Sequence, residues 1–118
     1  MISKFTYRQE IELQKESYSR IRLIVDDMIR DYQEGFMKRE EFLKGIERYI
    51  ELVNKSIIKL ENVNVPKKYE NAHSHFLRAT RLFKRAFSSL LEDNLDDYKK
   101  FIKEMEMEYE YGLALMKL

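Results

Sequence analysis

Apolar residues recur along the chain at alternating steps of three and four in four separate stretches. Such steps place them on one face of an α-helix, and a sustained period of about 3.5 residues is typical of helices that pack side by side. The stretches run from Tyr7 to Tyr32, from Leu43 to Leu60, from Tyr69 to Leu90 and from Leu95 to Met116. They predict four amphipathic helices, and the recurring apolar positions are called the seams below.

Helix-breaking residues are rare, with three Gly and one Pro in the whole sequence. Gly35 suits the left-handed conformation that ends a helix, and Pro66 suits a first helical turn. Asn94, followed by Asp97, resembles a capping box. We therefore expect helices over residues 3–34, 38–62, 66–93 and 95–117.

Seams of this period stay in contact when helices cross at about +20°, the angle of most four-helix bundles. Short connections make successive helices antiparallel. The sequence thus predicts an all-α fold, an antiparallel up-down-up-down four-helix bundle with a coiled-coil-like heptad core. Its 118 residues, 44% of them hydrophobic, suffice for one domain over residues 1–118.

Residues 104–111 alternate charged and apolar side chains with period two, as a half-buried strand does. We interpret them as helical, because a lone strand would have no partner and the fourth seam continues through them. Residues two apart in a helix point in nearly opposite directions. A second apolar stripe opposite the seam is therefore expected, formed by Met107, Tyr111, Ala114 and Leu118.

This stripe is the candidate partner interface, either with a second copy of the chain or with a foreign protein. Its flanking glutamates favour a basic partner. Two other interpretations remain open. Ile2 and Phe5 from the N-terminus can cover the stripe, or the end of the last helix can fray.

The protein has no strong overall electrostatic field, because its 22 Lys and Arg residues nearly balance its 21 Asp and Glu residues and leave a net charge of +1. No stretch approaches the roughly 18 apolar residues of a membrane span. The sequence has no Cys, which excludes disulfides, thiolate metal sites and a thiol nucleophile. This composition is typical of a soluble, cytoplasmic protein.

Candidate chemistry is sparse. Glu70 and His73 match the Glu-x-x-His unit of two-metal helical bundles, but the rest of such a site is missing and His75 is the only other histidine. No Gly-rich phosphate loop and no Ser-His-Asp set occurs. We therefore expect no enzyme activity, no metal site and no cofactor, and identify no small-molecule substrate.

A basic face on the third helix carries Arg78, Arg81 and Arg85, a possible phosphate-binding patch. The fourth helix is rich in acidic residues, so charge pairing between helices explains the same pattern. The aromatic residues occupy the seams and do not interleave with the arginines as a base-stacking surface requires. The pattern disfavours nucleic acid as a partner.

Gln14 is the one strongly polar seam residue. In an antiparallel up-down-up-down bundle it lies in the same layer as Ser56 and His73. Such a layer either lines a small-ligand pocket or forms hydrogen bonds that fix helix register. We favour the second interpretation.

These features together favour a non-enzymatic protein–protein interaction or regulatory module, with homodimerisation as one form. The alternatives are a small-ligand- or metal-binding bundle, and a nucleic-acid-binding protein that uses the basic face of the third helix.

Overall fold

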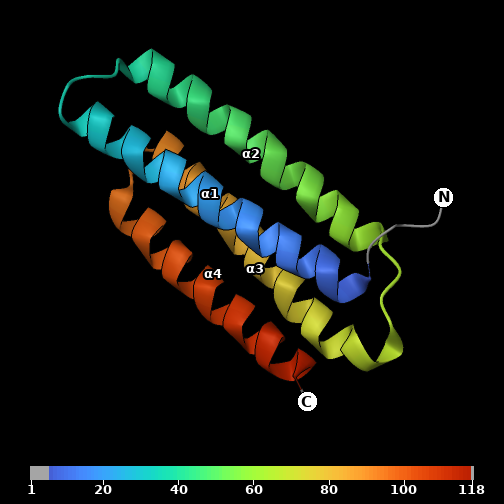
Figure 1. The fold of residues 1–118 in the computed structure, drawn as a ribbon. Helices are drawn as coiled ribbons and strands as arrows, with labels where there is room; N and C mark the ends of the chain where they lie inside the picture. Colours follow the sequence, from blue (N-terminus) through green and yellow to red (C-terminus); the bar gives the residue numbers. More distant parts are fainter. Residues whose placement is uncertain (1–5, 118) are drawn as a thin grey trace. The chain divides into compact units, whose positions relative to one another are not determined.

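Four α-helices dominate the computed structural model, which describes residues 6–117 (Figure 1). They are α1 (Tyr7–Gln33), α2 (Arg39–Asn62), α3 (Glu70–Leu91) and α4 (Leu95–Met116), and one turn of 3-10 helix, η1 (Lys67–Tyr69), precedes α3. Within the described part of the chain, 88% of the residues are helical and no strand occurs. The expected all-α fold class with four helices is confirmed.

The chain divides into two compact units, one ending at Phe42 and the other beginning at Leu43. The first unit contains α1 and the first turn of α2. The second contains the remainder of α2 together with η1, α3 and α4.

Helix α1 begins at Tyr7, whereas the sequence predicted a start at residue 3. Thr6 has an extended backbone and caps the helix: its Oγ1 accepts from the Gln9 amide at 3.2 Å, and Gln9 Oε1 accepts from the Thr6 amide at 2.9 Å. This reciprocal capping box fixes the helix start at Tyr7. Residues 3–5 of the expected helix lie outside the part that the structure describes.

The end of α1 follows the prediction at Gly35, whose φ is 82°. The amide of Phe36 donates to the Asp31 carbonyl at 2.8 Å and that of Gly35 donates to Tyr32 at 3.2 Å, the bonds of a Schellman motif. In the first turn of α2, the Phe42 ring stacks on Tyr32 with 4.5 Å between centroids. This contact joins the end of α1 to the first turn of α2 within the first unit.

The link between α2 and α3 is fixed by a histidine. His73 Nε2 lies 2.8 Å from the Leu60 carbonyl oxygen. Because a carbonyl only accepts, Nε2 carries the proton and donates it to the last turn of α2, whose carbonyls lack intrahelical partners. Pro66 precedes the 3-10 turn, so α3 begins at Glu70 and not at residue 66 as expected.

Helices α3 and α4 lie side by side and antiparallel (Figure 1). The Phe76 ring packs against Tyr109, and the Phe87 ring against Tyr98, with centroid distances of 5.1 and 6.3 Å. The first residues of the two predicted seams, Tyr69 and Leu95, are half-buried, and the remaining seam residues are buried, which confirms the seams along the length of both helices. In α3 the buried seam residues are Ala72, Phe76, Ala79, Phe83, Ala86 and Leu90, and in α4 Tyr98, Ile102, Met105, Tyr109, Gly112 and Met116.

The turn between α3 and α4 confirms Asn94 as the helix cap, but Asp97 does not complete the expected capping box, because the Asn94 backbone amide donates elsewhere. Asn94 Oδ1 accepts from the Asp97 amide at 3.0 Å, and the Asn94 amide donates to the Ser89 carbonyl at 2.9 Å. Asp93 adopts a left-handed φ of 58° between the two helices. As a result α3 ends at Leu91, two residues before the expected boundary.

Candidate interaction surface

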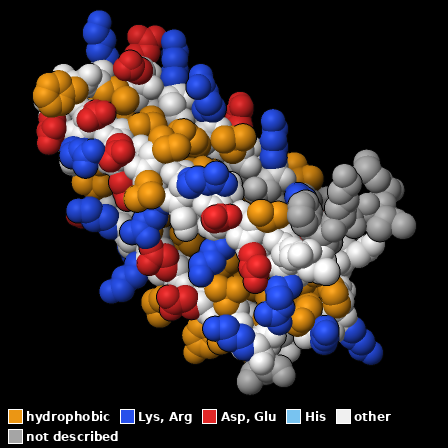
Figure 2. Space-filling view, viewed as in Figure 1, with side chains coloured by type: hydrophobic (Ala, Val, Ile, Leu, Met, Phe, Trp, Pro, Cys, Tyr) orange, Lys and Arg blue, Asp and Glu red, His pale blue; other side chains and the backbone are white. Residues whose placement is uncertain are grey.

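The outer face of α4 carries exposed apolar side chains. Met107 is 55% exposed and Tyr111 64%, and Ala114, one turn further on, is also exposed. These three residues are called the α4 strip. Leu118, the fourth residue of the expected stripe, lies outside the described residues, as do Ile2 and Phe5. Figure 2 shows that, on the face in view, apolar side chains reach the surface among acidic and basic ones.

The strip forms a shallow depression lined by Met107, Glu110, Tyr111 and Ala114. Its one charged member, Glu110, forms no ion pair with another residue in the described range. The surface therefore combines apolar area with one carboxylate that the fold does not use.

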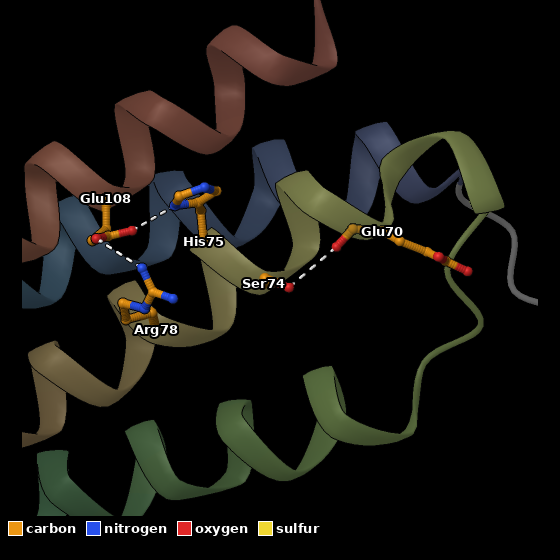
Figure 3. A network of polar contacts seen from close by, with 5 residues as sticks. All are labelled: Glu70, Ser74, His75, Arg78 and Glu108. Atoms are coloured by element: carbon orange, nitrogen blue, oxygen red, sulfur yellow. Dashed lines mark hydrogen bonds and ion pairs between the residues drawn. The ribbon is translucent and has the colours of Figure 1, made fainter.

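A polar network supports the tyrosine of the strip. The His75 ring stacks on Tyr111, with centroids 5.6 Å apart and planes 18° apart. His75 Nδ1 lies 2.6 Å from Glu108 Oε2, and Arg78 Nη1 donates to Glu108 Oε1 at 3.3 Å. Figure 3 shows His75 and Arg78 of α3 pointing toward Glu108 of α4. The network thus holds the imidazole against the tyrosine ring.

The charge of Glu108 is stabilised by this arrangement. The hydrogen bond from His75 lowers the pKa of Glu108 below its ordinary value of 4.5, and the Arg78 hydrogen bond and charge lower it further. Partial burial acts in the opposite direction and is outweighed. The carboxylate therefore stays ionised and accepts both hydrogen bonds at neutral pH.

Each arginine of the predicted basic face already has a partner within the second unit. Arg78 pairs with Glu108, Arg81 Nη2 pairs with Glu61 Oε2 at 3.0 Å, and the Arg85 guanidinium lies 4.4 Å from the Phe101 ring centroid. Exposed ion pairs of this kind contribute only about 0–1 kcal/mol each. The pairs nevertheless engage Arg78 and Arg81. Of the three arginines, only Arg78 pairs with a described acidic residue of α4, as the interhelical pairing interpretation expects, and Arg85 contacts an aromatic ring instead.

A groove between α2 and α3 was not anticipated from the sequence. Ile57 and Ile58 supply its apolar surface, and Ile58 is 58% exposed. This surface is called the α2–α3 groove, and no carboxylate of the described residues lines it. Its residues are Asn54, Ile57, Ile58, Arg81, Lys84, Arg85 and Ser88. The sequence signal was the Ile57-Ile58 pair, because adjacent helical residues cannot both face the seam.

The three residues of the predicted polar layer are all partly buried. Gln14 belongs to the first unit, whereas Ser56 and His73 belong to the second. His73 bonds to the Leu60 carbonyl. The layer that would join Gln14 to Ser56 and His73 stays a prediction.

The described residues provide no three-ligand metal site, and Ser74 does not form a triad with His75. No cluster of three or more His, Asp or Glu residues there is placed to hold a metal ion. Ser74 Oγ donates to the Glu70 carbonyl at 3.4 Å and points away from His75 (Figure 3), so it does not extend the His75–Glu108 pair into a triad.

Between residues 6 and 117, no helix has the length and apolar character needed to cross a membrane. Comparison of the chain with protein-family models, with curated proteins and with solved structures finds no match.

Proposed function

We propose that the protein is a non-enzymatic interaction module whose contact surface is the α4 strip. The observation that carries this proposal is the exposure of Met107 and Tyr111, which are neighbours at i and i+4 on one helical face. Contiguous apolar surface of this kind usually marks a partner site, and Met and Tyr are enriched in interface cores.

The support beneath Tyr111 strengthens the proposal. Ordering an exposed side chain on binding costs about 0.5–1.5 kcal/mol. Here the His75 ring already restrains the tyrosine ring, and Glu108 restrains His75. A preorganised aromatic side chain is a suitable anchor for a partner because less conformational freedom is lost on contact.

The proposed partner is a second copy of the chain. Identical surfaces can pair across a two-fold axis, or the strip of one copy can enter a different surface of the next. We place this self-association in the cytoplasm, which fits a sequence without cysteine. Arg78 and Arg81 are ion-paired within the fold, and Ser74 does not join the His75–Glu108 pair, which supports a binding role over catalysis.

Sedimentation velocity on a strip variant, Met107→Glu with Tyr111→Glu, tests the proposal. Two buried carboxylates would oppose association, so we expect the parent protein to self-associate and the variant to sediment as a monomer with unchanged helicity. Leu52→Glu is the control for a carboxylate at an exposed apolar position elsewhere, since Leu52 is 42% exposed on α2, and it should associate like the parent.

Three results would count against the proposal. A parent that stays monomeric at every concentration contradicts self-association. A strip variant that associates as strongly as the parent shows that the strip is not the contact. A strip variant that unfolds would assign Met107 and Tyr111 to the core.

A further inference from the structure

We infer that the α4 strip of one copy docks in the α2–α3 groove of the next copy. The inference rests on the proposed function and names the surface that the strip meets. Both surfaces lie in the second unit, so one folded chain carries both halves of the contact.

The groove offers an apolar surface beside cations. Ile57 and Ile58 come from α2, while Arg81, Lys84 and Arg85 come from α3. Lys84 has no carboxylate partner within residues 6–117. Within the same residues Arg85 contacts the face of Phe101 and no carboxylate, so its N–H donors are open to an acidic group. An occupant that is apolar and carries a carboxylate fits this surface.

The α4 strip has this composition. Met107, Tyr111 and Ala114 are apolar, and Glu110 supplies a carboxylate in the same depression. The lengths also agree. The strip covers seven residue steps of α4 and the α3 wall of the groove covers seven from Arg81 to Ser88, each about 10 Å at 1.5 Å per residue.

Charge favours this contact over pairing of two strips. In a strip-to-strip contact, the two Glu110 carboxylates would approach each other as apolar surface was buried around them, and like charges there are unfavourable. In the strip-to-groove contact, Glu110 meets Lys84 and Arg85. Opposite charges then lie at the margin of an apolar contact.

A strip-to-groove contact is heterologous, because the two surfaces in it differ. Each copy that joins leaves one strip and one groove unfilled, and growth continues until a ring closes or a filament forms. Strip-to-strip pairing would stop at a dimer. A mixture of a strip variant and a groove variant therefore distinguishes strip-to-groove docking from strip-to-strip pairing.

Mixing two defective variants of the full chain provides the test. The strip variant is Met107→Glu with Tyr111→Glu, and the groove variant is Lys84→Glu with Arg85→Glu. We expect each variant alone to sediment as a monomer. Together they should form a one-to-one complex, since the groove variant retains a working strip and the strip variant a working groove.

A matched charge control is Lys67→Glu with Lys68→Glu, which changes the net charge equally at two exposed positions of η1. It should associate like the parent. Circular dichroism establishes that each variant is folded. If the groove variant loses helicity, Lys84→Gln with Arg85→Gln removes the same charges without reversing them.

The outcomes separate the inference from the proposed function. A groove variant that associates like the parent, while the strip variant does not, overturns the inference and leaves strip-to-strip association standing. Two monomeric variants that fail to combine also overturn it. Association that survives in the strip variant overturns the proposed function itself.

Discussion

Gly112 sets how closely α4 approaches α3. A Cβ atom built at this position would lie 2.5 Å from Cε1 of Phe76 and 2.9 Å from its Cδ1. Real Cβ atoms do not approach a ring so closely, so Phe76 would have to move, and it is fully buried. The absence of a side chain at residue 112 therefore permits the close packing of the two seams.

Replacing Gly112 with alanine tests this close approach. Alanine normally stabilises a helix by about 1 kcal/mol over glycine. Here the overpacking against Phe76 should outweigh that gain, and we expect Gly112→Ala to lower the free energy of unfolding by about 1–3 kcal/mol in urea denaturation.

The same substitution in a Phe76→Leu background is the control. A smaller side chain leaves room for the methyl group, so Gly112→Ala should there be neutral or stabilising, and the two substitutions should be coupled. An increase in stability in the parent background would show that α4 does not pack tightly at this point.

At the scale of the helices, α3 and α4 are joined by a network at their surface as well as by their seams. Arg78 and His75 both bond Glu108, whose side chain is 24% exposed. The network is more protected than an isolated surface ion pair, and it responds to pH through the carboxylate.

The sign of that response follows from the lowered pKa of Glu108. The folded state favours the carboxylate form, so its contribution to stability is fully present above the ordinary pKa of 4.5 and is lost as pH falls through the lower folded value. We expect urea midpoints to fall in this acid range, and to fall less in Glu108→Gln. If the urea midpoint fell equally with decreasing pH in the parent and in Glu108→Gln, the assigned role of Glu108 would be contradicted.

The helices were predictable because their signal is local and periodic. The spacing of apolar residues alone identified the seams of α3 and α4, and the residue types at positions 94 and 97 predicted the Asn94 cap. The start of α1 was missed although Thr6 and Gln9 have capping-box spacing. The 3-10 turn after Pro66 was missed because one turn gives no periodic signal.

Side-chain partners were harder to predict than helices. His75 and Glu108 lie 33 positions apart in the sequence, and their meeting depends on helix rotation and rotamers that no local pattern encodes. The sequence did indicate opposite charges on α3 and α4, and hence the type of contact. It did not indicate that His75 would support Tyr111, or that Ile58 would lie in a groove with Lys84.

At the scale of the whole molecule, the second unit presents two unlike surfaces. The α4 strip is apolar with an acidic residue, and the α2–α3 groove is apolar with basic residues. A chain with a net charge of +1 has no strong overall field to guide association. Recognition must then come from local complementarity, and salt should weaken it by screening the charged margin of the contact.

The central claim is that the α4 strip is the surface of self-association, and the methionine methyl groups test it most directly. Met107 is exposed on the strip, Met28 and Met37 lie in the first unit, and Met105 and Met116 are buried in the α4 seam. In a methyl-labelled NMR concentration series, we expect the Met107 signal to shift progressively while those of Met28 and Met37 stay in place. A Met107 signal that does not change over the whole series, or shifts confined to Met28 and Met37, would contradict the claim.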